Sequence, residues 1–216
     1  MKIAVFGATG MAGSAIVSEA LTRGHAVVAA SRRAGTTIRE DSRLAVQAVD
    51  VADTEAVAPV LADIDAAVLT IRLAPGEMEQ LASLTSGFLD AAARQGTRVL
   101  IVGGSAPLRS PNYSDRLLID DPDYVPKEWK SIAQASLSQF HACQEHPYTG
   151  WVYLSPPAIF EAGIRTGSYQ RGTTTLVTDM NGASRITAPD FAIAVIDELE
   201  QPTSDPHFTV AYGVVP

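Results

Sequence analysis

The chain has 216 residues, of which 46% are hydrophobic and 19% charged, and its net charge at pH 7 is −8. These values fit one globular domain and exclude a disordered chain. The acidic balance excludes a duplex-binding surface, because the dense basic spot is limited to Arg32 and Arg33. The single cysteine, Cys143, excludes an internal disulfide, so we expect a buried structural thiol and a reducing compartment.

No stretch reaches the roughly 18 apolar residues that a membrane-spanning helix needs, and the N-terminus enters a strand pattern at once. We therefore expect no membrane association, no leader and a cytoplasmic protein.

The first half of the chain alternates strand and helix patterns. Residues 2–6 form a short apolar run, and residues 12–23 then carry apolar pairs at the helical spacing of four. Further strands are predicted over residues 25–31, 43–49, 65–71 and 97–104, and helices over residues 53–61, capped by Asp53 or Thr54, and about 75–95. This alternation predicts an α/β fold with a doubly wound parallel sheet.

The second half departs from this alternation. Residues 106–125 form a proline-rich loop after a strand end, where a loop commonly shapes a ligand site. After it we expect a helix from Pro126 to Cys143 with an apolar face of Trp129, Ile132, Ala133, Leu137 and Phe140.

Downstream we predict a sixth strand over residues 148–156, an extended run over 173–178 paired with "SRIT", a helix over 190–200 and a final edge strand, "HFTVAYG". These elements make a small α+β C-terminal extension. The whole chain, residues 1–216, is predicted to be one domain with a substrate-loop region at about 105–185.

Three glycines, Gly7, Gly10 and Gly13, stand in "GATGMAG" between the first strand and the first helix. In this context one glycine permits a tight turn, one lets backbone approach a pyrophosphate and one lets helix and sheet pack closely. The helix start also points unpaired N–H groups and a positive dipole end at the turn. We expect a dinucleotide pyrophosphate there; the alternative is that the glycines only serve the turn.

The end of the second strand indicates which dinucleotide is bound. An acid at this place accepts hydrogen bonds from a ribose 2′-hydroxyl, whereas an arginine pairs with a 2′-phosphate. The chain has Ser31, Arg32 and Arg33, which favours NADP(H) over NAD(H), with Arg32 as the first choice for the phosphate and Ser31 as an additional donor. The alternative for the arginines is a solvated turn.

Other strand ends extend the predicted site, because a dinucleotide lies across the carboxyl ends of the strands. Asp50 and Val51 are expected to border the adenine, and Thr70 and Ile71 the ribose and pyrophosphate. For Asp50, a helix-capping or surface role is equally open.

Four stretches carry a resemblance to a known family: "KIAVFGATGMAGSAIVSEALTRGHAVVAASRR", "RVLIVGGSAPL", "WVYLSPPAIFEAGIRTGSYQ" and "SRITAPDFAIAVIDELEQP". They resemble the atypical short-chain dehydrogenase relatives, which include NmrA-like proteins, biliverdin reductase B and, most similar, bacterial NADH-flavin reductases. The resemblance implies a Rossmann-type fold with NADP(H) or NAD(H) in the groove and a variable substrate region in the second half.

The larger superfamily uses a tyrosine and a lysine four residues later, but Tyr124 is followed by Lys127 and Lys130, at spacings of three and six. We expect neither Tyr124 nor Lys127 to be catalytic. The flavin-reductase relatives imply instead direct hydride transfer from nicotinamide to a stacked planar ring, which needs positioning more than acid catalysis.

Ser105 follows the fifth strand and is the catalytic candidate, as a donor to substrate or cofactor, although a plain turn role is equally open. The relatives have "GGAGSL" where this chain has "GGSAPL", so the hydroxyl has moved. The resemblance also places Leu154, Ser155 and Pro156 beside the nicotinamide carboxamide. Tyr153 and Phe160 are expected in the core or in a stacking wall.

The residues predicted to bind the dinucleotide are, in full, Gly7, Thr9, Gly10, Met11, Gly13, Ser31, Arg32, Arg33, Asp50, Val51, Thr70, Ile71, Leu154, Ser155 and Pro156. The four histidines show no ligand spacing, so no metal is expected.

The predicted function is an NAD(P)H-dependent, NADPH-preferring oxidoreductase that reduces a flavin, a quinone or a similar planar acceptor. The alternatives are an NmrA-like redox sensor without turnover and an NAD-dependent epimerase-like enzyme. The expected partner is the small-molecule acceptor, with no nucleic acid.

Overall fold

The computed structural model describes residues 1–33, 41–74 and 76–213. Its strands are β1 (Lys2–Phe6), β2 (Ala26–Ser31), β3 (Leu44–Ala48), β4 (Ala66–Leu69), β5 (Arg98–Val102), β6 (Trp151–Ser155), β7 (Ile159–Glu161), β8 (Gln170–Gly172), β9 (Arg185–Thr187) and β10 (His207–Ala211). Its α-helices are α1 (Met11–Thr22), α2 (Thr54–Leu61), α3 (Leu81–Gln95), α4 (Lys130–Glu145) and α5 (Ala188–Glu200). Short 3₁₀ turns are η1 (Met78–Gln80), η2 (Leu118–Asp120) and η3 (Lys127–Trp129).

The main sheet of the described chain has the strand order β3-β2-β1-β4-β5-β6-β10-β8. All neighbours from β3 to β10 pair in parallel, and β8 pairs antiparallel with β10. An order of 3-2-1-4-5-6 defines the Rossmann type of doubly wound sheet, so the predicted fold class is confirmed.

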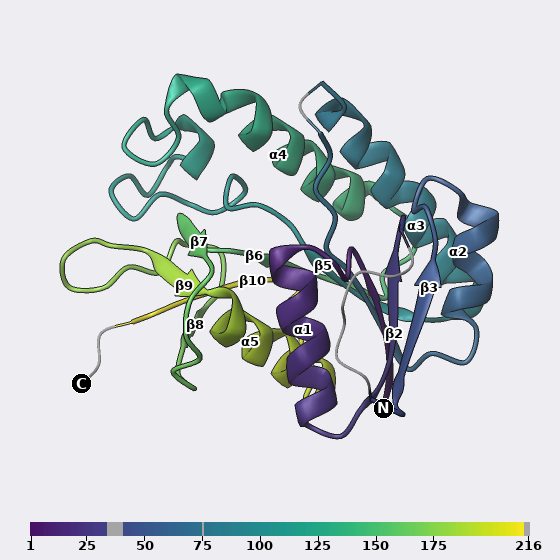
Figure 1. Ribbon diagram of the computed structural model, residues 1–216. Coiled ribbons are helices and arrows are strands. Elements are labelled where there is room, and N and C mark those ends of the chain that lie inside the picture. The colour runs from purple at the N-terminus through teal and green to yellow at the C-terminus, as the bar shows by residue number, and fades with distance from the viewer. Residues whose placement is uncertain (34–40, 75, 214–216) are drawn as a thin grey trace.

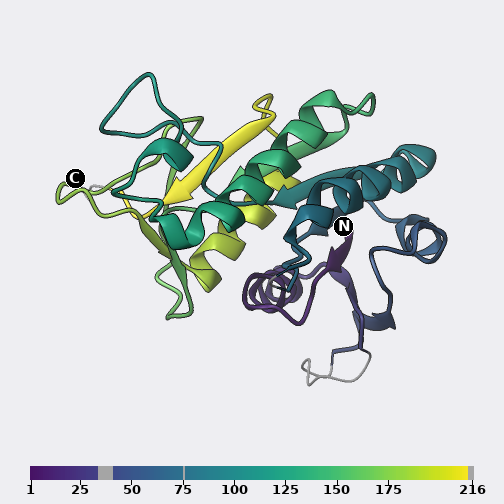
Figure 2. The ribbon, with the colours of Figure 1, turned by 90° about the horizontal axis from the view of Figure 1, so that it is seen from above.

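Helices cover both faces of this sheet (Figure 1). On one face α1 and α5 bury a core that includes Ile16, Phe191 and Phe208. On the other face lie α2, α3 and α4, with α3 and α4 side by side in Figure 2, over a core that includes Phe6 and Phe88. Because both faces are covered, the central strands are continuous apolar runs.

Local chemistry sets the helix ends. Asp53 caps α2 by accepting hydrogen bonds from the backbone N–H groups of Glu55 and Ala56. Gly96 ends α3 in the left-handed conformation, at a φ of 67°. Gly96 was the predicted end of α3, and Asp53 was one of the two predicted caps of α2.

An ion-pair network fixes the end of α1 to α5. Arg23 pairs with Glu19 at 2.9 Å, with Asp197 at 2.7 Å and with Glu200 at 2.8 Å. The other carboxylate oxygen of Glu200 lies 2.8 Å from the ring Nε2 of His25. Since Glu19 is buried, this network is shielded from solvent more than a typical surface pair.

Two predictions for the C-terminal extension are wrong. Residues 173–178 form no strand, because their backbone partners come from the 106–125 loop: the N–H of Arg109 bonds the carbonyl of Thr174, and that of Leu176 bonds the carbonyl of Arg109. The "SRIT" strand, β9, pairs instead with β7. β10 is not an edge strand, because β8 folds back to cover it.

The predicted apolar face of α4 is wrong at its first turn. Trp129 and Ile132 are 60% and 40% exposed. The helix buries Ala135, Ser136, Gln139 and Cys143 instead.

Cys143 is fully buried, as predicted, and burial raises the pKa of its thiol to about 12. The reactive thiolate is therefore scarce at neutral pH. We expect a thiol reagent at pH 8 to leave the native protein unlabelled and to label one thiol per chain in denaturant. Labelling is monitored by absorbance. Rapid labelling of the native protein would contradict the buried position of Cys143.

Candidate functional site

The sheet has its switch point between β1 and β4, where the chain connections leave toward opposite faces. The registers Phe6↔Ala30 and Phe6↔Leu69 bring the carboxyl ends of β2, β1 and β4 level with one another. In sheets of this type, ligands bind in the crevice outside such strand ends. The turns after these strands therefore form the candidate site.

Gly7 fixes the turn after β1 against the neighbouring strand ends. Its φ is 86°, and a Cβ there would lie 2.0 Å from the carbonyl oxygen of Thr70. The N–H groups of Gly7 and Ala8 both bond the carbonyl of Ala30, at 3.0 and 3.2 Å. A Cβ on Gly13 would lie 2.1 Å from the carbonyl oxygen of Gly7, so this glycine lets α1 pack on the turn.

Gly10 differs from the other two glycines. It is exposed, its φ is −74°, which any residue adopts, and a Cβ there would meet among the described atoms only the carbonyl oxygen of Gly7, at 3.3 Å. The fold itself therefore has little need for glycine at this position. Glycine here is what a close approach of a ligand to the backbone requires.

The start of α1 fits an anion. Gly10 is the N-cap, no described side chain caps the helix, and its first turn carries no acidic residue. The first intrahelical bond runs from the N–H of Ser14 to the carbonyl of Gly10, so the amides before it have no helical acceptor. Thr9 and Met11 are exposed beside them, which brings five predicted residues together at one helix end.

The predicted phosphate-binding residues lie at the carboxyl end of β2, where the carbonyl of Ala30 also bonds the glycine turn. Arg32 and Arg33 are exposed. The hydroxyl of Ser31 is buried and donates to the carbonyl of Arg33 at 2.8 Å. Ser31 thus shapes the arginine turn, and its hydroxyl proton is already engaged.

The turns after β3 and β4 lie at the same sheet edge. The carboxylate of Asp50 accepts from the N–H of Ala52 at 3.0 Å, so this exposed residue orders its own turn, while Asp53 is the cap of α2. Val51 is buried in the core. Thr70 touches the glycine turn through its carbonyl, and Ile71 packs on the α2–α4 side.

The turn after β5 is held by Tyr153. A Cβ on Gly103 would lie 1.9 Å from its ring, and its hydroxyl accepts from the N–H of Gly104 at 3.3 Å and donates to the carbonyl of Ser136 at 3.1 Å. Burial raises the pKa of Tyr153, so it stays neutral. Tyr153 belongs to the core and fixes the turn that carries Ser105, whose carbonyl accepts from the N–H of Leu108.

The predicted residues Leu154 and Ser155 end β6, Pro156 follows it, and all three are buried. The carbonyl of Leu154 accepts from the N–H of Gly103 at 3.0 Å. The hydroxyl of Ser155 lies 2.9 Å from Nε2 of His207. Burial lowers the pKa of His207 to about 4, so this pair is neutral at pH 7.

Tyr124 lies before η3 and packs on a small cluster of Leu108, Leu118 and Leu176. Burial, together with the carboxylates of Asp121 and Asp123, raises the pKa of Tyr124. That Tyr124 is not catalytic stays a prediction.

Asp190, on which the segment after β7 is anchored, was not among the residues predicted from the sequence. This buried carboxylate accepts from the N–H groups of Thr166, at 2.9 Å, and Gly167, at 2.8 Å, and from the hydroxyls of Thr166 and Tyr212. Burial alone would raise the pKa of Asp190, but the hydrogen bonds from Tyr212, Thr166 and Gly167 outweigh it and lower the pKa. The order Pro189–Asp190 is typical of a helix start and could have indicated a structural role for this acid. The local sequence does not show its hydrogen-bond partners, which lie more than twenty residues away along the chain.

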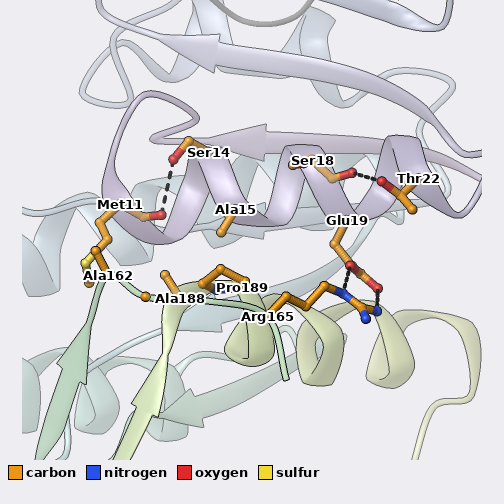
Figure 3. A pocket seen from close by; sticks show the side chains of 11 residues that line it. Met11, Ser14, Ala15, Ser18, Glu19, Thr22, Ala162, Arg165, Ala188 and Pro189 are labelled. Carbon is orange, nitrogen blue, oxygen red and sulfur yellow. Dashed lines mark hydrogen bonds and ion pairs between the residues drawn. The ribbon is translucent and has the colours of Figure 1, made fainter. Parts of the chain in front are cut away.

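The segment that Asp190 anchors borders α1 in a shallow groove (Figure 3). Met11 and Ala162 face each other at one end, and Arg165 binds both carboxylate oxygens of Glu19, each at 3.0 Å, at the other. Burial would raise the pKa of Glu19, but Arg165 and Arg23 lower it. The groove includes Met11 and none of the other predicted dinucleotide residues.

A Rossmann-type sheet with an uncapped glycine turn at its switch point defines a dinucleotide-binding protein. The chain belongs to the NAD(P)H-binding family, whose model matches residues 7–202. It is 37% identical to the uncharacterized protein YwnB of Bacillus subtilis, over 97% of this chain and 98% of that protein. The resemblance stated from the sequence is thereby confirmed.

Solved structures agree with this assignment. A protein of Streptococcus pneumoniae described as a candidate NADH-flavin reductase is 29% identical, with a TM-score of 0.86 over 98% of this chain and 99% of that one. A protein of Bacteroides thetaiotaomicron described as a candidate epimerase is 30% identical, with a TM-score of 0.86 over 98% of this chain and 96% of that one.

Within the described residues, no helix is both long and apolar enough to cross a membrane.

The three glycines have separable roles that substitution by alanine tests. Gly10→Ala should leave the thermal midpoint within a few degrees of the native value but weaken dinucleotide binding about tenfold or more, because the methyl group meets the ligand. Gly13→Ala, the matched control, should unfold the protein at a clearly lower temperature, because its Cβ meets backbone. Dinucleotide affinity is measured by nicotinamide fluorescence. If soluble Gly10→Ala binds the dinucleotide as tightly as the native protein, the ligand does not lie at this turn.

Asp190→Asn should lower the free energy of unfolding at pH 7 by about 1–3 kcal/mol, because the amide nitrogen faces donors. Since the folded-state pKa of Asp190 lies below its unfolded value, its stabilisation is complete above about pH 4 and is lost as the pH falls through the folded-state value. Urea unfolding of both proteins should therefore converge toward acid pH. Asp115→Asn, in an exposed loop, is the control; a constant difference at all pH values would refute the carboxylate role.

Proposed function

We propose that this protein is an NADPH-dependent oxidoreductase that passes a hydride to a flavin, a quinone or a similar planar acceptor. The observation that carries the proposal is the uncapped start of α1 above Gly10, at the switch point of the sheet. Membership of the NAD(P)H-binding family supports the cofactor class. The likeness to a candidate NADH-flavin reductase supports the reductase class.

The preference for NADPH is argued from charge. Arg32 and Arg33 are exposed directly after β2, where a dinucleotide presents its adenine ribose. A guanidinium binds a 2′-phosphate with two parallel hydrogen bonds, whereas a ribose hydroxyl is best held by a carboxylate. No carboxylate stands at residues 31–33.

The residues of this chain supply position and charge stabilisation. The free N–H groups at the start of α1 hold the pyrophosphate, and the backbone groups of residues 154–156 that are not engaged in the sheet are proposed to orient the nicotinamide ring. Ser105 is proposed as a hydrogen-bond donor to cofactor or acceptor, from the turn that Tyr153 fixes. When bound, NADPH supplies two electrons and one proton as a hydride, and the acceptor takes its second proton from solvent.

The proposed reaction does not need Tyr124 as a proton donor. A carbonyl substrate needs a proton at its oxygen during hydride transfer, which a tyrosine and lysine pair provides. A flavin or quinone stabilises the incoming charge in its own ring, so the high pKa of Tyr124 is no obstacle.

The likeness to a candidate epimerase favours a second hypothesis, an NAD-dependent epimerase-like enzyme. The position of Tyr124, ahead of η3 in a small apolar cluster, opposes it, because such chemistry needs a proton-transferring side chain. A dinucleotide-binding sensor without turnover remains the third hypothesis.

Titration with NADPH and with NADH tests the cofactor. NADPH should bind more tightly, and Arg32→Asp should weaken NADPH binding by roughly 10- to 100-fold while changing NADH binding little, because a charge-assisted bond to the 2′-phosphate is lost. Arg94→Asp, in the last turn of α3, is a control with the same charge change at the opposite edge of the sheet.

The acceptor is tested by NADPH oxidation with FMN, a naphthoquinone and a sugar nucleotide. Oxidation with the planar acceptors supports the reductase. Tight NADPH binding with no turnover of any acceptor would support the sensor, and failure to bind either dinucleotide would refute the proposal as a whole.

A further inference from the structure

The apolar stripe of α4 continues beyond the surface that it covers. The helix buries Ala135, Ser136, Gln139 and Cys143 against the sheet and α3. Ile132 stands three and four residues before Ala135 and Ser136, so it points to the same side of the helix, and Trp129 precedes Ile132 by three. Both are nevertheless exposed, by 40% and 60%.

The reason is that the sheet ends before the helix does. A Cβ on Gly104 would lie 2.6 Å from the hydroxyl oxygen of Ser136, so Ser136 sits over the turn that follows β5. Trp129 precedes Ser136 by seven residues, or about 10 Å of helix rise. The first turn of α4 thus overhangs the carboxyl edge of the sheet, the edge that also holds the glycine turn.

This overhang is held in place. Nζ of Lys130 donates to the carbonyl of Ile119 at 2.8 Å, and the N–H of Trp129 donates to the carbonyl of Pro126 at 3.0 Å. The N–H groups of Tyr124 and Val125 both bond the carbonyl of Asp121. An exposed tryptophan on such an anchored turn is a preformed apolar surface.

We propose that Trp129 and Ile132 form the wall against which the planar ring of the electron acceptor stacks. The inference rests on the proposed function, because it takes the acceptor to lie at the cofactor edge. An exposed large aromatic side chain on a turn beyond this edge suits a neutral fused ring, such as an isoalloxazine or a naphthoquinone. Stacking uses the ring face alone, and the charged residues Glu128 and Lys130 stand on either side of Trp129 in the sequence.

Three variants test the wall. Trp129→Ala removes the ring, Trp129→Phe keeps an aromatic face, and Trp151→Phe is the matched control, because Trp151 begins β6 at the opposite edge of the sheet. Binding of FMN and of menadione is measured by calorimetry with saturating NADP⁺, where no turnover occurs. NADPH affinity, steady-state kinetics and oligomeric state are measured alongside.

We expect Trp129→Ala to raise the dissociation constant and the KM of both acceptors about tenfold, as loss of one stacking contact does. Trp129→Phe should stay within about threefold of the native values, and NADPH affinity should be unchanged in all three variants. An equal loss in Trp151→Phe would show a general structural effect and overturn the assignment.

Two other outcomes overturn the wall and leave the proposed reductase function intact. The first is that Trp129→Ala binds both acceptors as tightly as the native protein does. The second is that the native protein is a dimer and Trp129→Ala is a monomer, which would assign the patch to contact with a second copy of the chain. Failure of the native protein to bind NADPH, or to bind either acceptor, refutes the proposed function and the wall together.

Discussion

The close approach of two backbone segments, the turn at Gly7 and the carbonyl of Thr70, is the constraint on which the site depends. Because Gly7 has no side chain, the turn after β1 lies directly on the end of β4, and the same carbonyl-to-carbon packing recurs between Gly7 and Gly13. These two contacts decide where α1 begins and which way its free amides point. The switch point of the sheet becomes a place for an anion through sterics first, and electrostatics second.

The remainder of the candidate site is assembled from distant parts of the chain. Tyr153, from β6, sets the turn after β5, and Asp190, from α5, ties the 166–167 turn to the end of β10. Both groups are buried and act through hydrogen bonds to backbone, so they define loop shape and leave the ligand to other residues. A scaffold of this kind lets exposed positions such as Trp129 vary while the strand ends stay fixed.

The sequence was sufficient for the doubly wound parallel class of the sheet, the glycine turn and the helix ends at Asp53 and Gly96, because each depends on local pattern or on one residue with special geometry. The sequence-based predictions failed where burial or strand pairing depends on which element packs against the segment. The stripe of α4 has the right period, yet periodicity cannot show that the sheet stops beneath Trp129. Likewise, pairing of β9 and of residues 173–178 depends on which backbone edges remain free after the fold is assembled.

The ion-pair network at the far end of α1 couples the site to the stability of the fold. Arg23, which Glu19 also binds, ties this helix to α5 through Asp197 and Glu200, about two turns or more from the amides at its start that have no helical acceptor. The helix therefore reaches the ligand already immobilised, and association need not order it. Affinity and folding are then thermodynamically linked: a substitution that loosens α5 weakens a site that it never touches, and a bound dinucleotide strengthens the packing of α1 on α5.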